Sequence, residues 1–156
     1  MVFSSNNRQN PAYYANRNQK FAESARQEES PKMPSFDIKN LSKELFDEIA
    51  DECAKIISES KKKETNKSTQ LRRFYDELVL WDERAGISEE AFKNALPFIF
   101  MIKSKVAYAK GRGTVDYVFQ EFMNRLIDQI TDIKTLKNAK LFMEAMMGFY
   151  KSYKQD

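Results

Sequence analysis

The sequence predicts an all-α fold, a compact bundle of five or six helices preceded by a flexible N-terminal leader. Apolar residues recur at helical spacing over most of the chain after residue 36. Glycine and proline number only four each among 156 residues, too few for a turn-rich β architecture. A chain of this length can form one domain with a core of its own. We therefore expect a single helical bundle domain over residues 36–156.

Residues 1–35 differ in composition from the rest of the chain. They are rich in Asn, Gln, Ser and Arg, and they contain three of the four prolines and only scattered aromatic residues. Such a sequence buries too little apolar area to fold alone. We interpret it as a disordered basic and polar leader. The alternative is an arm that becomes ordered on RNA or on a neighbouring subunit.

The first helix is expected over residues 41–62. Residues three or four positions apart form its buried face, which consists of Leu45, Ile49, Cys53 and Ile56. Asn40 or Ser42 can cap its first turn. Because Cys53 lies on the apolar face, we interpret it as an inert core thiol rather than as a nucleophile.

The second helix is expected over residues 68–84, and Gly86 marks its end. Arg72 and Arg73 lie in its first turns, where the positive end of the helix dipole disfavours cations. This placement suggests an anionic partner, to which the helix start can also offer backbone amides. The alternative is that both arginines pair with acids four residues further along the same helix.

Residues 88–113 contain the most apolar run of the chain. Ser88 is a capping residue, and Gly111 and Gly113 fit a left-handed helix end. Between residues 96 and 112 apolar side chains occur on nearly every side, so we expect this helix to be the central element of the bundle. Pro97 predicts a kink or a break near Ala95. No acid lies between residues 96 and 113 to answer the cations there.

Two further helices are expected over residues 115–130 and 135–153, with Thr114 capping the former. The apolar face of the last helix is wider than one neighbouring helix needs, because Phe142, Phe149 and Tyr153 extend it to one side. Core packing is the simpler interpretation of these aromatic residues. A contact with a second copy or another subunit is the alternative.

Charge is strongly segregated on this chain, although its net charge is only +3. Residues 61–73 hold six cations and one acid, and residues 93–112 hold five cations and no acid. Residues 44–52 hold five acids and no base. Such segregation predicts one positive and one negative face.

Catalytic chemistry finds little support in the residue inventory. The chain has no histidine and a single cysteine, which excludes histidine-based catalysis and the usual zinc sites. Its glycines form no nucleotide-binding loop. We therefore expect no catalytic residues, no metal and no cofactor. No signal peptide or membrane-spanning run is recognised, and we expect a cytoplasmic protein without membrane contact.

Three functional hypotheses remain. The first is a module that binds a nucleic-acid backbone through Lys and Arg without reading bases. The second is a helical protein–protein adaptor or homo-oligomeric scaffold whose charged faces drive assembly, with no direct RNA contact. A small enzyme is the third, and the residue inventory disfavours it.

Three segments resemble one known family in the order expected for it. Residues 67–78 read KSTQLRRFYDEL, residues 96–112 read LPFIFMIKSKVAYAKGR, and residues 141–150 read LFMEAMMGFY. They resemble the small subunit of type III-A CRISPR effector (Csm) complexes. Each motif alone is weak, but their combination is specific. The long leader before Phe36 departs from the family core.

This resemblance implies a helical protein without catalytic activity, of which several copies stack along the effector complex. It implies contacts with CRISPR RNA, with target RNA, with other subunits of the complex and with copies of itself. The RNA contacts would ignore sequence. The residues expected to make them are Lys67 (at the edge of the set), Arg72, Arg73, Lys103, Lys105, Tyr108, Lys110 and Arg112.

Overall fold

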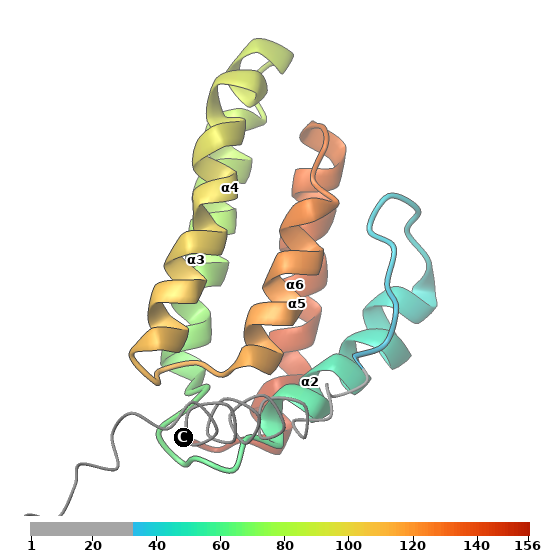
Figure 1. Cartoon of the computed structure of the whole chain (residues 1–156). Coiled ribbons are helices and arrows are strands. Elements are labelled where there is room, and N and C mark those ends of the chain that lie inside the picture. The colour runs from blue at the N-terminus through green and yellow to red at the C-terminus, as the bar shows by residue number, and fades with distance from the viewer. Residues whose placement is uncertain (1–32) are drawn as a thin grey trace, which may run out of the picture. The chain divides into compact units, whose positions relative to one another are not determined.

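The computed structural model describes residues 33–156, so residues 1–32 of the predicted leader (residues 1–35) lie outside this part. Within it the chain is helical and contains no strand, which confirms the predicted all-α class (Figure 1). A π-helical turn, η2, continues directly into α2. The elements are η2 (Leu45–Ile49), α2 (Ala50–Ser58), α3 (Ser68–Ala85), α4 (Glu89–Gly111), α5 (Tyr117–Asp128) and α6 (Ile133–Tyr153).

The most extensively packed helix is α6, which lies against η2, α2 and α3. By contrast, α4 packs against α3 and α5, at one side of this part of the chain. The prediction that residues 96–112 form the central element is therefore wrong. Only one stripe of α4 is buried, and it includes Ile99, Ile102 and Val106. Phe98 and Met101, on its outward side, remain exposed.

The first helix differs from its prediction in both length and register. It ends at Ser58 rather than at residue 62. Because a π-turn inserts one extra residue, the buried face passes from Leu45 to Ala50 and then to Cys53 and Ile57. Ile49 and Ile56, which the regular pattern placed in the core, are only partly buried. Ser42 caps the start, as its hydroxyl oxygen accepts a hydrogen bond from the Leu45 amide at 3.2 Å.

The helix α4 is continuous from Glu89 to Gly111 with Pro97 inside it, so the predicted break near Ala95 is absent. Ser88 caps it as predicted, accepting a hydrogen bond from the Ala91 amide at 3.1 Å. Of the two glycines at its end, only Gly113 has a left-handed backbone, with φ of 77°. Glycine adopts this conformation without strain, and here it turns the chain toward α5.

The helices α5 and α6 are both capped by aspartates that the sequence patterns did not predict. Asp116, not Thr114, accepts the Phe119 amide at 3.1 Å, while the Thr114 hydroxyl donates to the Ala109 carbonyl. Asp132 forms a capping box with Thr135 at the start of α6. The Asp132 carboxylate accepts hydrogen bonds from the amide and from the hydroxyl of Thr135. These bonds, that from the amide above all, hold the pKa of Asp132 below its usual range.

An extended segment, residues 33–40, precedes the helices and packs on α5 and α6. Its apolar side chains Met33, Phe36 and Ile38 are buried. The Gln129 side chain pairs with the segment's backbone at both Ile38 and Phe36, with each hydrogen bond 3.0 Å long. Asn138, buried in α6, donates to the Ile38 carbonyl at 2.8 Å. The segment thus completes the core on this side of the bundle.

Candidate nucleic-acid interface

The helices α3 and α4 form an antiparallel hairpin, so the start of α3 and the end of α4 lie together. The Asn66 amide donates to the Thr114 carbonyl at 3.0 Å at this end, and Trp81 stacks on Phe98 further along. We call residues 67–73 and 105–112 the basal end of the hairpin. It brings together seven of the eight predicted RNA contacts. The exception is Lys103, whose side chain faces α5.

Four of the predicted cations are engaged by carboxylates. Lys103 lies 2.6 Å from Asp128 of α5, and Lys105 lies 3.0 Å from Glu77 of α3. Lys103 and Lys105 are therefore paired with acids of neighbouring helices, although no acid occurs in their own stretch of sequence. Lys67 pairs with Glu64 at 2.6 Å. Arg72 pairs with Asp76 at 3.2 Å, as the alternative interpretation of this helix start expected, but Glu77 pairs with Lys105 and not with Arg73.

The other three cations, Arg73, Lys110 and Arg112, are exposed and have no acidic partner among residues 33–156. The guanidinium of Arg112 lies 5.8 Å from the centre of the Tyr108 ring. Tyr108 is 68% exposed, so it does not belong to the core. Helical spacing places Lys110 on the other side of α4 from Tyr108, in the last turn. These four residues of the predicted set are exposed, and no carboxylate among residues 33–156 forms an ion pair with the three cations.

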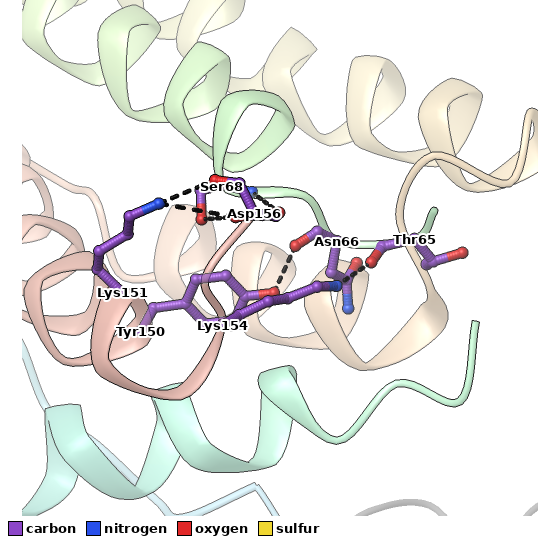
Figure 2. Close-up of polar contacts among 7 residues, drawn as sticks. All are labelled: Thr65, Asn66, Ser68, Tyr150, Lys151, Lys154 and Asp156. Carbon is purple, nitrogen blue, oxygen red and sulfur yellow. Dashed lines mark hydrogen bonds and ion pairs between the residues drawn. The ribbon is translucent and has the colours of Figure 1, made fainter. Parts of the chain in front are cut away.

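The start of α3, which could offer its amides to a phosphate, is instead occupied by Asp156 (Figure 2). The carboxylate of Asp156 accepts hydrogen bonds from the Ser68 amide at 2.8 Å and from the Ser68 hydroxyl at 2.6 Å. Burial opposes ionisation of this carboxyl, yet the hydrogen bonds from Ser68 hold its pKa below the usual range. Lys151 donates to the Asp156 carbonyl at 2.9 Å. No sequence pattern pointed to this contact, which spans most of the helical domain.

Asn66 anchors the basal end to the rest of the bundle, and no motif singled it out. It is fully buried with a positive φ of 57°, a conformation that Asn adopts more readily than most residues. Its side chain accepts from the Asp116 amide at 3.0 Å and donates to the Ile57 carbonyl at 3.2 Å. The Tyr150 hydroxyl donates to its carbonyl (Figure 2). Burial raises the pKa of Tyr150, so this hydroxyl stays protonated.

Comparison with known protein families identifies the chain. The family model Csm2 Type III-A matches residues 40–156, well over half of the sequence. The chain belongs to the Csm2 family. This is the small-subunit family of type III-A CRISPR effector complexes, and it confirms the resemblance seen in the three sequence segments. No curated protein and no solved structure matches the chain.

In residues 33–156 of this Csm2 family member we looked for a reactive thiol, a metal-binding cluster and a membrane-spanning helix. Burial raises the pKa of the Cys53 thiol to about 12, which makes it a poor nucleophile and agrees with the predicted core role. Within residues 33–156 no three His, Cys, Asp or Glu side chains lie close enough together to hold a metal ion. None of the helices over the same range has the length and apolar character needed to cross a bilayer.

A cleft of about 470 Å³ lies between α3 and α6 in this Csm2 family member, beside the basal end. Arg72 and Lys151 line it, but both are engaged, Arg72 by Asp76 and Lys151 by the Asp156 carbonyl. Glu144 lines it as well. Because both cations already have partners and Glu144 adds a negative charge, the cleft is less suited to bind a phosphate than the surface around Arg73 and Arg112.

Proposed function

We propose that this protein is a non-catalytic small subunit of a cytoplasmic type III-A effector complex that holds the guide and target RNA by their backbones. Membership of the Csm2 family supports the place in the complex. The observation that carries the RNA contact is the set of exposed cations Arg73, Lys110 and Arg112, which lack acidic partners among residues 33–156. A phosphate can bind them without first displacing a carboxylate.

Backbone contacts of this kind are independent of base sequence, because Lys and Arg neutralise phosphates that every RNA carries. The exposed ring of Tyr108 can stack on a base, which also tolerates any sequence. Lys67, Arg72, Lys103 and Lys105 are secondary contacts in this proposal. Their partners lie at the surface, where ion pairs are weak, and a phosphate can replace a carboxylate there.

The proposed partners are the CRISPR RNA, its target RNA, the other subunits of the complex and further copies of this chain stacked along it. Catalysis would belong to other subunits, since the sequence contains no histidine and its one cysteine is buried. The protein would act by lining the RNA path with cations fixed on two packed helices.

Co-expression with the other subunits and a guide RNA tests the proposal. The wild-type protein should co-purify with the complex, and so should the triple variant Arg73→Ala, Lys110→Ala, Arg112→Ala. In isolation, this variant should bind RNAs of unrelated sequence more weakly than the wild type does, and by about the same factor for each RNA. A matched control removes three exposed lysines elsewhere, Lys55, Lys134 and Lys137, and should bind RNA nearly as the wild type does. A protein that joins the complex but binds no RNA would instead be the adaptor.

A further inference from the structure

Two aromatic rings on the outward side of the α3/α4 hairpin stack on each other at the surface. Trp81 of α3 and Phe98 of α4 lie nearly parallel, with an angle of 12° between their planes and 5.8 Å between their centres. Phe98 is 53% exposed, and Trp81 is only partly buried. The stacked rings of Phe119 and Phe122, by contrast, are fully buried in the core. We call Trp81 and Phe98 the aromatic ledge, an exposed apolar feature of the kind that marks a binding site.

A cation without a carboxylate partner accompanies the aromatic ledge. The guanidinium of Arg84 lies 5.8 Å from the centre of the Trp81 ring, and Arg84 forms no ion pair within residues 33–156. The same combination occurs at the basal end, where Arg112 lies 5.8 Å from the centre of the Tyr108 ring. A ring offers its face to a base, and a neighbouring guanidinium attracts the phosphate that the nucleotide carries. The hairpin therefore has two places with the chemistry of a single-strand contact.

These two places lie on the same side of α4. Helical spacing connects Phe98 to Tyr108 through Met101 and Lys105, at alternating intervals of three and four residues. The two rings are ten residues apart, which is about 15 Å along a helix. Because a nucleic-acid strand in a duplex advances about 3.4 Å per nucleotide, about four nucleotides cover this distance. Modules that hold single strands have binding sites of that size or larger.

The charges on the outward side of the hairpin favour a polyanion. By helical spacing, the cations on this side are Arg73 and Arg84 of α3 and Lys105 and Arg112 of α4. The acids are Glu77, which pairs with Lys105, and Glu90 at the start of α4. Four cations against two acids leave a net charge of +2 on this side. A protein partner would also cover the exposed apolar side chains, but only a polyanion uses the unpaired guanidinium beside each ring.

We propose that the aromatic ledge is a second base-stacking place, and that the outward side of the hairpin holds about four unpaired nucleotides between the ledge and Tyr108. This inference rests on the proposed function and specifies the RNA, a strand whose bases are free rather than paired. One base stacks on Phe98 and another on Tyr108, while Arg84 and Arg112 bind phosphates at the two ends. Bases inside a duplex stack on their neighbours, so their faces are not available to these rings. Every base has such a face, so the contact is independent of sequence.

Trp81 is the only tryptophan of the chain, so its fluorescence reports on the aromatic ledge. Titration of the full chain with a single-stranded oligouridylate or oligoadenylate should quench this emission, with the same midpoint as the fluorescence anisotropy of the labelled RNA. The two strands annealed to each other should bind in a salt-dependent way but leave the emission unchanged. Equal quenching by the duplex, or binding of a single strand without any change in emission, would overturn the stacking proposal and leave backbone binding intact.

Substitution of Phe98 separates stacking from charge. Phe98→Leu removes the ring but keeps an apolar side chain, and it should weaken single-strand binding about fivefold or more without altering the salt slope or the affinity for the duplex. Phe98→Tyr keeps a ring and should bind as the wild type does. Phe100→Leu, which changes another exposed ring on a different side of α4, is the matched control and should have no effect.

A Phe98→Leu variant that binds single strands as tightly as the wild type would overturn the proposal. If that variant also failed to join the effector complex, the aromatic ledge would instead be the site of a protein partner. A wild-type protein that binds neither the single strands nor the duplex would overturn the proposed function together with this inference.

Discussion

The ammonium group of Lys105 lies 3.0 Å from each carboxylate oxygen of Glu77, across the α3/α4 hairpin. This contact joins two residues that are 28 positions apart in the sequence. It both ties the end of α4 to α3 and neutralises one of the cations expected to face RNA. Lys105 differs in this respect from Arg112, which lies further along the same side of α4. Arg112 forms no ion pair with an acid in the described part of the chain.

Removing the Glu77 charge should therefore strengthen RNA binding. Glu77→Gln frees the Lys105 ammonium for phosphate and deletes one repulsive carboxylate beside the proposed RNA path. We expect the affinity for any RNA to rise several-fold at low salt, measured by fluorescence anisotropy. Glu48→Gln, which deletes an exposed acid on η2, is the control and should change little. Equal effects of the two variants would mean that only net charge matters.

The hydrogen bond from Tyr150 to the Asn66 carbonyl should contribute measurably to stability. Tyr150→Phe keeps the ring but leaves a buried carbonyl without this donor, which costs about 1–3 kcal/mol. Urea unfolding followed by circular dichroism measures the loss. Tyr153→Phe removes a hydroxyl that bonds Asp51 at the surface and should shift the midpoint much less. If the two variants were equally stable, the Asn66 contact would carry no special weight.

Cys53 should be unreactive in the folded protein. Its thiol is buried, and burial raises its pKa to about 12, so the thiolate that attacks a disulfide reagent is scarcely populated. Reaction with a chromogenic disulfide should be slow under native conditions and immediate in denaturant. Rapid labelling of the native protein would contradict the packing of α2.

Acid should destabilise the protein in part through Asp132. The pKa of this carboxyl is lowered below its ordinary value of 3.8 in the folded state, so the folded protein holds the ionised form more strongly than the unfolded chain does. The ionised Asp132 therefore contributes fully to the free energy of unfolding at pH values above the ordinary pKa. This contribution disappears as the pH falls through the lower pKa of the folded state. Asp132→Asn should unfold at a lower urea concentration near neutral pH but lose less stability on acidification. Parallel pH profiles would rule out this role.

Local features of the fold could be predicted from the sequence, because they depend on neighbours within a few residues. The bounds of α3 and the Ser88 cap follow from apolar spacing and capping chemistry in this way. The π-turn at the start of the first helix could not be predicted, since an irregular turn leaves no mark in a regular period. It moved Ile49 out of the core and Ala50 into it.

Tertiary contacts account for the remaining differences. The apolar run in α4 suggested a central helix, but burial depends on which neighbours pack against it, and α6 took that place. The ion pairs of Lys103 and Lys105 could not be predicted either. Asp128 and Glu77 reach Lys103 and Lys105 from other helices, and Asp156 reaches Ser68 across 88 positions of sequence. Such pairings are set by packing, which charge counting along the chain does not include.

The salt dependence of RNA binding is the most direct test of the proposed function. For wild-type protein and a single-stranded RNA of any sequence, the logarithm of the affinity should fall steeply and linearly with the logarithm of the salt concentration. In the variant Arg73→Ala, Lys110→Ala, Arg112→Ala that slope should be smaller by about two to three units, because each substitution removes one cation from the phosphates. A slope that is unchanged in this variant, or an affinity that depends on base sequence and not on salt, would contradict backbone binding at the basal end.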